Sequence, residues 1–370
     1  TMKNKKQFYK IIYKKLINIL VSIIIFLTPT NFFLKFFESE SYVNGLRVDY
    51  LIPKLYLSDV FILILLFFWV TNKKSKLRIN KKKIKKFLKG KCLIIVLILI
   101  FVLRQLFTSY PISSVMYLLR IMELGFLVKF LSKNKKKINK SWIKNSVLIT
   151  LLFQSSVAIY QYIYQKSLFG YLLLGEPNLS NYIGVTKNNL FGAEKILPYG
   201  TTAHPNVLGG FLAIYLIYIF NKVGWKLENF AKIMIIFLSI LVLFLTQSVS
   251  AIIAFLLGLS LIIYQKYSKK TKKILRKKLT LKNIAFLILA LIITTISLLN
   301  ILARKYPNNQ SISRRNYLNV AALNMTRSNI LVGVGLNNFT SEVENFSDNK
   351  EVVRFVQPAH NIFLLFFAET

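Results

Sequence analysis

The chain has 370 residues, of which 54% are hydrophobic, and its 51 lysine and arginine residues against 13 acidic ones give a formal charge of +38. Several apolar stretches approach the ~20 residues that a helix needs to cross a bilayer. This composition excludes a soluble protein built on one buried core and predicts an all-α, polytopic membrane protein. The single cysteine, Cys92, excludes an internal disulfide framework and a cysteine metal site.

About ten apolar stretches predict a transmembrane helical bundle, with an error of several residues at each boundary. In chain order the predicted spans are 16–34, 55–71, 92–108, 113–131, 145–165, 204–221, 232–248, 250–265 and 283–302, followed by one that opens at 359. The last span stops about half-way across a bilayer. We therefore expect a truncated product, or a piece of a longer gene.

Three regions follow from these spans. Residues 1–302 are predicted to form a bundle of about nine helices, and 303–358 a large extracytoplasmic loop that carries the candidate site. Residues 359–370 are predicted to begin a truncated transmembrane helix. The large outer loop thus lies between spans nine and ten.

Lysine-rich and lysine-poor segments alternate when the spans are threaded in order. Most basic residues lie in 1–15, 73–91, 129–144, 222–232 and 266–282. All of these segments fall on one side, which the positive-inside rule assigns to the cytoplasm. We therefore expect a multi-pass protein with a cytoplasmic N-terminus. Lysine exceeds arginine 41 to 10, which indicates an AT-rich bacterial genome and hence the bacterial cytoplasmic (inner) membrane.

The basic runs 73–91 and 266–282 resemble nucleic-acid patches. Anchoring on the anionic lipids of the inner leaflet explains them better, because both runs flank apolar spans on the predicted cytoplasmic side. We expect membrane lipids as partners and no nucleic acid.

The predicted outer loops face a compartment without ATP or nucleotide sugars, so an enzyme there needs a donor that arrives activated. A lipid-linked diphosphate is the obvious donor, and the planar guanidinium group matches its phosphates best. The chain prefers lysine overall, yet five of the seven basic residues in the last loop are arginine: Arg304, Arg314, Arg315, Arg327 and Arg354. This bias indicates a phosphate-binding role.

Both histidines stand at the predicted outer mouth of a span. His204 precedes Pro205, and His360 precedes Asn361. Each is explained either as a polar group at a helix start or as a proton acceptor, because imidazole titrates near neutrality. The spacing His-x-x-x-His does not occur, and we predict no metal and no cofactor.

Three further features of the sequence have a structural interpretation. Gly333 and Gly335 predict a tight turn rather than a nucleotide loop, because the third glycine of such a loop is missing. Arg120 and Glu123 are three residues apart within a span and predict either an ion pair or part of a substrate path. Thr246–Ser250 predicts a short outer turn between two spans.

An ordered set of motifs resembles the O-antigen ligase and O-antigen polymerase superfamily. These motifs are Arg315–Met325, Gly333–Phe339, His360–Leu364 and Ala368–Thr370, preceded by His204–Gly209, which resembles the family's Pro-Asn-x-Leu-Gly element. The resemblance implies an all-helical, metal-independent membrane glycosyltransferase of about twelve spans, with a large outer loop between the ninth and tenth. One position departs from the family, because Val249 stands where an arginine is expected.

The resemblance also implies the substrates: a donor glycan linked to polyprenyl diphosphate, and a glycan or lipid acceptor. We expect Arg315 to hold the diphosphate with help from Arg314, and His360 to accept the proton of the acceptor hydroxyl. Asn361 would hydrogen-bond the sugar or fix the imidazole, whereas His204 and Asn206 would line the opposite wall. Catalytic candidates are His360 and Arg315; substrate-binding candidates are Arg314, Asn361, His204, Asn206 and Asn338.

Two alternatives from other classes stay open. A lipid-linked glycan flippase or transporter would use the arginines along a path, although the internal symmetry typical of transporters is not evident. A non-catalytic partner of a polysaccharide assembly complex would explain Val249. Within the enzyme class, the sequence does not separate a ligase from a polymerase, which differ in the acceptor.

Overall fold

The computed structural model describes residues 2–73, 95–179, 184–190, 193–223, 230–270, 310–330, 332–349 and 357–370. The predicted span 283–302, most of the two long basic runs, and Arg304 and Arg354 lie outside these residues. The described chain is mostly helical, in agreement with the predicted all-α class, with three short two-stranded ribbons that were not predicted.

Each predicted span that the structure describes overlaps a helix. The α-helices are α1 (Met2–Leu27), α2 (Leu57–Lys73), the helix at Ile95–Phe107, α4 (Pro111–Asn134), α5 (Lys140–Tyr164), α6 (Pro205–Val223), α7 (Phe230–Leu245), α8 (Val249–Lys270), α10 (Gln310–Ser328), α11 (Phe339–Glu342) and α13 (Ile362–Glu369). Short 3₁₀ helices are η1 (Glu38–Glu40), η3 (Gln105–Phe107), η4 (Gly170–Leu172) and η5 (Val343–Phe346).

The strands form local ribbons. Strand β1 (Phe33–Lys35) pairs with β4 (Lys54–Tyr56), β2 (Tyr42–Val43) pairs antiparallel with β3 (Leu46–Arg47), and β5 (Lys187–Leu190) pairs antiparallel with β6 (Ala193–Ile196). Strands β2, β3, β5 and β6 lie outside the predicted spans, whereas β1 and β4 overlap the ends of the predicted spans 16–34 and 55–71.

Two of the described helices, Lys140–Tyr164 and Val249–Lys266, are both long and apolar enough to cross a bilayer. Shorter apolar helices lie at Leu57–Thr71, Ile95–Phe107 and Phe230–Leu245. Five consecutive residues from Val96 to Ile100 are all largely exposed, so the helix that carries them is apolar on every side. Such a surface suits lipid better than water. The predicted total of ten spans is not confirmed.

The chain divides into two compact units. The first unit holds Thr1–Leu34, Leu55–Asn72 and Phe126–Leu275, and the second holds Lys35–Lys54, Lys73–Gly125 and Arg276–Thr370. Helix α4 begins in the second unit and ends in the first.

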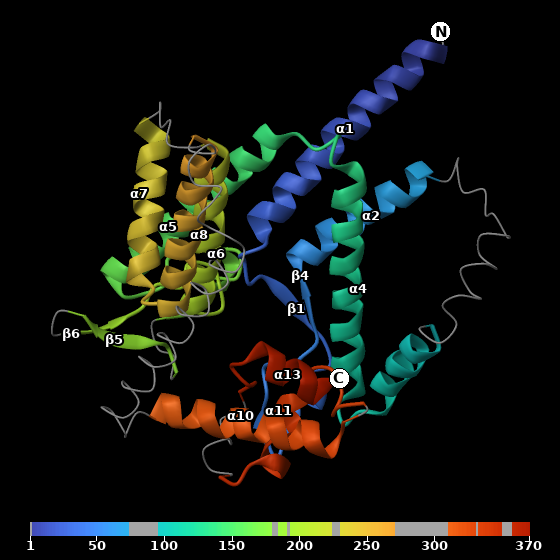
Figure 1. Ribbon diagram of the computed structural model, residues 1–370, viewed down its shortest axis with the longest axis vertical. Coiled ribbons are helices and arrows are strands. Elements are labelled where there is room, and N and C mark those ends of the chain that lie inside the picture. The colour runs from blue at the N-terminus through green and yellow to red at the C-terminus, as the bar shows by residue number, and fades with distance from the viewer. Residues whose placement is uncertain are drawn as a thin grey trace. The chain divides into compact units, whose positions relative to one another are not determined.

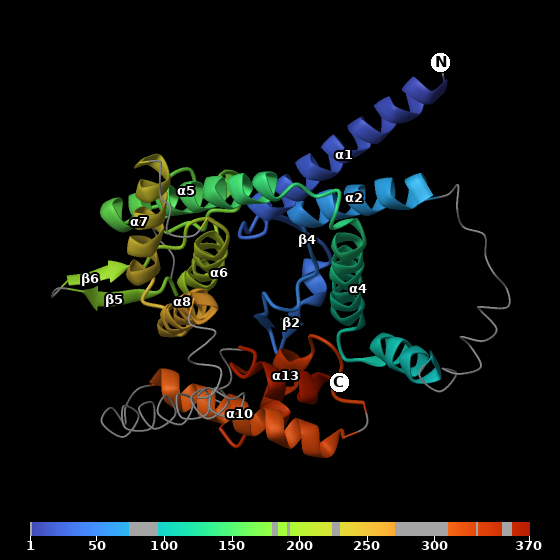
Figure 2. The same cartoon turned by 45° about the horizontal axis from the view of Figure 1, so that its top comes forward.

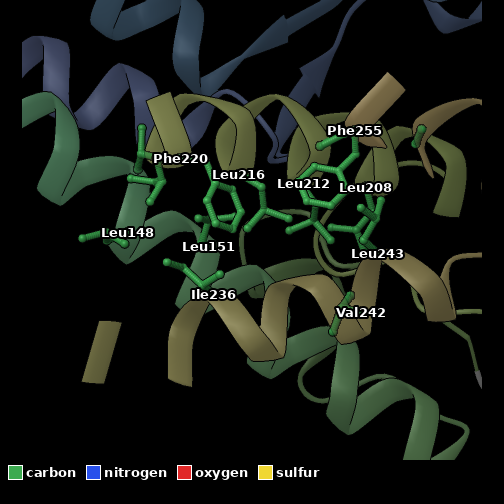
Figure 3. Packing of buried hydrophobic residues seen from close by; sticks show 14 of the residues in the cluster. Leu148, Leu151, Leu208, Leu212, Leu216, Phe220, Ile236, Val242, Leu243 and Phe255 are labelled. Carbon is green, nitrogen blue, oxygen red and sulfur yellow. The ribbon is translucent and has the colours of Figure 1, made fainter. Parts of the chain in front are cut away.

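The main core of the first unit lies among α5, α6, α7 and α8, which pack against one another; α6, α7 and α8 lie side by side in Figure 1, and α5 crosses them. Leu208, Leu212, Leu216 and Phe220 recur every four residues and therefore form one stripe on α6. Figure 3 shows this stripe packed among Leu148 and Leu151 of α5, Ile236, Val242 and Leu243 of α7, and Phe255 of α8.

A second cluster of the first unit joins α1, α2 and the end of α4. Ile17, Leu20, Val21 and Ile24 lie on one face of α1, and the rings of Trp69 and Phe130 meet edge to face at 5.5 Å. The predicted span 16–34 was too long, because α1 ends at Leu27. The residue before a proline is disfavoured in a helix, and Pro29 follows Thr28 directly.

Polar contacts of the first unit gather at its loops. Asn18 donates to the Lys137 carbonyl (3.2 Å) and accepts from the Asn139 N–H (2.7 Å), which ties the lysine-rich loop to α1. After the C-terminal end of α1, the Asn31 N–H donates to the Thr201 carbonyl (2.8 Å). The lysine-rich loop thus contacts the interior of α1, and the loop at Thr201 contacts the segment that follows the helix.

The second unit packs around the face that α10 shares with α13, and Figure 2 shows the two helices side by side. Leu318, Ala321, Ala322 and Met325 are buried at spacings of three and four residues, which is one helical face. The small side chains of Ala321 and Ala322 let the two helices approach closely. The predicted loop 303–358 is therefore largely helical where it is described.

Candidate functional site

Helix α10 sets the positions of the two candidate arginines. Arg314 and Arg315 precede Leu318 by four and three residues, so they lie one turn before the buried face of α10. Arg314 is half-buried and Arg315 is exposed. The same face that packs on α13 thus continues into a pair of guanidinium groups.

Helix α13 sets the position of His360. The Asn361 side-chain oxygen accepts the N–H groups of Phe363 (3.0 Å) and Leu364 (3.3 Å), which makes Asn361 the N-cap of the helix. His360 is the residue directly before this cap, and it is exposed. The capping bonds fix the backbone at Asn361, so Asn361 supports the position of His360 through the main chain.

The charges of the two arginines act on His360. Partial burial lowers the pKa of His360 below its ordinary value, and the charges of Arg315 and then Arg314 lower it further. These charges act on the imidazole although 45 residues separate Arg315 from His360. At neutral pH the imidazole is therefore uncharged and able to accept a proton.

The turn at 333–339 packs in the same core as α10 and α13, and its backbone confirms the predicted tight turn. Gly333, Gly335 and Asn337 have positive φ values of 55°, 105° and 58°. The N–H groups of Val334 (2.9 Å) and Gly335 (3.1 Å) donate to the carbonyls of Ala368 and Glu369. The turn is thereby hydrogen-bonded to the end of α13.

Gly333→Ala is expected to lower the free energy of unfolding by about 2–4 kcal/mol, because the residue is left-handed and its Cβ would collide with the backbone of Glu369. Gly125→Ala is the matched control, since its Cβ would meet nothing within 4 Å in α4. Thermal unfolding in detergent measures both variants. An unchanged midpoint for Gly333→Ala would show that the turn does not support the fold.

Asn338 has a structural place in this turn. Its side chain is fully buried, donates to Ser114 Oγ (2.6 Å) and the Leu336 carbonyl (2.9 Å), and accepts the Tyr110 N–H (2.9 Å). Sequence reasoning placed Asn338 in contact with substrate. Because the amide is enclosed and hydrogen-bonded at both ends, we assign it a positioning role instead.

Sequence reasoning missed the side chains that hold the turn. Glu369 is nearly buried, and its carboxylate accepts the backbone N–H groups of Asn337 and Phe339. Gln105, fully buried, accepts the Leu336 N–H (2.9 Å). The sequence did contain one indication of the role of Gln105. It is a polar residue within an apolar span, where a polar side chain needs a hydrogen-bond partner.

The remaining candidates belong to the first unit. The ring of His204 accepts the Asn206 N–H at Nδ1 (3.1 Å), and its Nε2 lies 3.2 Å from Thr186 Oγ1. Because Nδ1 accepts, the proton of the neutral ring resides on Nε2 and is donated to Thr186. His204 therefore caps the first turn of α6, as one of the two interpretations of this residue expected.

The element around His204 packs on the turn between α7 and α8. A Cβ on Gly209 would lie 2.9 Å from Thr246 Oγ1 and 3.0 Å from Ser248 Cβ, so glycine permits this approach. The predicted turn at Thr246–Ser250 is confirmed, with Gln247 at a φ of 54°. Val249, in place of the expected arginine, is 66% exposed on this turn.

The same unit contains a buried carboxylate. Glu176 is fully buried and accepts the N–H groups of Leu168 (2.7 Å), Phe169 (2.9 Å) and Gly170 (2.8 Å) as well as the Gln161 amide (2.9 Å). Gln161 also accepts the N–H groups of Tyr199 and Gly200. These bonds order the loop that leads to His204.

The candidates thus form two groups, one in each unit. Arg314, Arg315, His360, Asn361 and Asn338 belong to the second unit, and His204 and Asn206 to the first. Residues 233–370, which include the whole second-unit group, match a family model described as O-antigen ligase. The match supports membership of the chain in the O-antigen ligase and polymerase superfamily.

This finding confirms the family resemblance drawn from the motifs. Similarity to the O-antigen ligase family over residues 233–370 supports, in general terms, an enzyme of surface polysaccharide biosynthesis that uses lipid-linked glycans. It also supports an integral membrane protein, in agreement with the two long apolar helices. No curated protein and no solved structure matches the chain.

Proposed function

We propose that this protein transfers a glycan from a polyprenyl-diphosphate carrier to an acceptor hydroxyl at the outer face of the cytoplasmic membrane. The observation that carries the proposal is the packing of α10 on α13, which places the charges of Arg315 and Arg314 near enough to lower the pKa of His360. A cationic pair next to an uncharged imidazole provides both a diphosphate ligand and a proton acceptor. Family membership supports the glycan chemistry.

Arg315 and Arg314 act on the donor. The bond between the anomeric carbon and the diphosphate oxygen breaks in the transfer, and the diphosphate leaves with the electron pair. Negative charge therefore grows on the oxygen that departs. Guanidinium groups fixed on the first turns of α10 stabilise this charge as it develops, because a helix holds them without reorganisation.

His360 acts on the acceptor. The acceptor oxygen forms the new bond to the anomeric carbon and loses its proton to the uncharged imidazole, on the face opposite the leaving diphosphate. The configuration at the carbon is inverted in this single displacement. Asn361 contributes by capping α13 and so holding His360 in place.

The outer-face location is supported by contacts within the second unit. Asn44 donates to Glu344 (2.9 Å), Asn337 donates to the Tyr50 carbonyl (2.7 Å), and Ser109 donates to Glu342. The three segments involved lie on the same side in the charge-based threading. Their mutual packing is what a common outer location requires.

The pH dependence of transfer follows from the lowered pKa of His360. A depressed pKa keeps the imidazole uncharged to more acidic pH than in a free histidine, whose pKa is about 6.5. We expect kcat/KM to be flat at neutral pH and to fall with a midpoint below 6.5. A midpoint above that value would count against His360 as the base.

Arg315→Gln removes one cause of the shift and should move the pKa of His360 upward. The chain has two histidines, so NMR of histidine-labelled protein, with His204→Ala for assignment, follows this titration without any substrate. Arg327→Gln, on the same helix, is the matched control and should leave the titration unchanged. If the pKa of His360 is the same in Arg315→Gln as in the wild type, the charge of Arg315 does not act on His360.

A further inference from the structure

A cavity of about 240 Å³ lies within the second unit, between the 37–53 segment and the start of α4. Its volume is below the ~300–1,000 Å³ of pockets that hold drug-sized ligands. The cavity therefore has room for one ring of a larger molecule. It is distinct from the residues Arg314, Arg315 and His360, none of which lines it.

The wall of the cavity is well ordered by its own contacts. Arg47 forms ion pairs with Glu38 (2.8 Å) and Asp49 (3.5 Å), which fasten the 37–53 segment. The Tyr110 hydroxyl donates to the Tyr42 carbonyl (2.7 Å), which fastens the segment to the residue before α4. A preformed cavity binds without the cost of ordering its wall.

The lining carries both an apolar face and hydrogen-bonding groups. Phe37 is 59% exposed and adopts a left-handed conformation with φ 50°, which is unusual for a bulky residue. Strained backbone conformations of this kind cluster at active sites and ligand-binding sites, where the surrounding structure holds them. Here it holds an aromatic ring at the cavity instead of in a core.

The polar groups of the lining retain hydrogen-bonding capacity. Ser113 Oγ accepts from Asn337 (2.8 Å) and keeps its own proton to donate. The Tyr110 hydroxyl, which donates its proton to Tyr42, keeps a lone pair to accept with. Glu40 adds a carboxylate acceptor. Donors and acceptors are thus mixed, as a ligand with several hydroxyl groups requires.

The charge of the lining excludes an anionic ligand. No lysine or arginine is found among the described residues that line the cavity, in a chain of formal charge +38. The Glu40 carboxylate would repel a diphosphate. The lining therefore suits a neutral, ring-sized and hydroxylated ligand, with C–H groups that pack on an aromatic face.

We propose that this cavity binds one neutral sugar ring of the glycan, next to Phe37 and within reach of Glu40, Tyr110 and Ser113. The inference rests on the proposed function and adds a subsite to it. The ring belongs either to the acceptor glycan or to the distal part of the donor glycan. Both sources present the same chemistry to the cavity.

Saturation-transfer NMR on the purified protein tests binding with single sugars: D-glucose, D-galactose, N-acetyl-D-glucosamine and L-rhamnose. We expect at least one of them to bind, and Phe37→Ala and Glu40→Gln each to weaken that binding about fivefold. Phe37→Tyr keeps the ring and should retain binding. Phe169→Ala and Glu194→Gln, an exposed aromatic and an exposed acid of the first unit, are matched controls.

Absence of binding by all four sugars, or equal binding by the cavity variants and the controls, would overturn the inference. In the transfer reaction, Phe37→Ala raises KM for the acceptor if the ring is the acceptor's, and KM for the donor if it is the donor's. If the KM values are unchanged in Phe37→Ala and transfer still depends on His360, the subsite is wrong and the proposed transfer function stands. Transfer that fails altogether leaves the NMR result as an independent test of the cavity.

Discussion

His360→Ala is expected to slow glycan transfer by about 10²–10⁴-fold, the range typical of a lost general base. The proton of the acceptor hydroxyl would then have to pass to water in the transition state. Donor binding should change little, because the imidazole is uncharged at neutral pH and the diphosphate is held by the arginines. The expected signature is a lower kcat with a nearly constant KM for the donor.

Fold integrity is the necessary control for this variant. His360 is exposed and lies outside α13, so removing its ring leaves the cap at Asn361 and the packing of Ala359 intact. We expect the thermal midpoint in detergent to stay within about 2 °C, since exposed substitutions usually change stability by less than ~0.5 kcal/mol. A large loss of transfer together with a large loss of stability would not support a chemical role.

Arg315→Gln is expected to lower kcat/KM by about 10²–10³-fold, because it removes a preorganised charge from the departing diphosphate. Arg315→Lys should recover only part of the loss, since an ammonium group lacks the fork that binds two phosphate oxygens at once. Steady-state rates with a lipid-linked donor measure both variants. Activity of Arg315→Lys equal to wild type would indicate simple charge attraction.

Arg327→Gln is the matched control for Arg315, because both arginines are exposed on α10 and differ by three helical turns. Its charge is not among those that act on His360. We expect activity within twofold of wild type. If Arg327→Gln and Arg315→Gln reduced transfer equally, the effect would reflect the general positive charge of α10.

Helix positions could be predicted from the sequence because apolar runs long enough to cross a bilayer leave few alternatives to a helix. Every predicted span on described residues overlaps a helix. The error at the end of α1 arose from hydropathy alone, since Pro29 and the threonines beside it already marked a break. The number of spans and their orientation stay predictions.

The candidate site could be predicted only in part. Motif order and the enrichment of arginine pointed to Arg315 and His360, and the charge of Arg315 lowers the pKa of His360; their roles in the reaction stay predictions. The role of Asn338 was missed, because a polar residue in a glycine turn is equally suited to bind a ligand or to hold the turn. Only its burial and its partners Ser114 and Tyr110 distinguish the two.

Residues that organise the loops were harder to find. Glu369 serves the 333–339 turn through backbone N–H groups about 30 residues distant in sequence, and no spacing rule connects them. Glu176 collects N–H groups from an irregular loop in the same way. Sequence patterns report periodic structure, whereas these contacts depend on how non-periodic segments close on themselves.

The most direct test of the proposed transfer uses purified protein in liposomes with a polyprenyl-diphosphate-linked glycan, and measures transferred glycan and released polyprenyl diphosphate together. We expect equal amounts of both products from the wild type. Because His360 and Arg315 act in one step, the double variant His360→Ala/Arg315→Gln should be about as slow as the slower single variant. Transfer within threefold of wild type in both single variants would contradict the proposal.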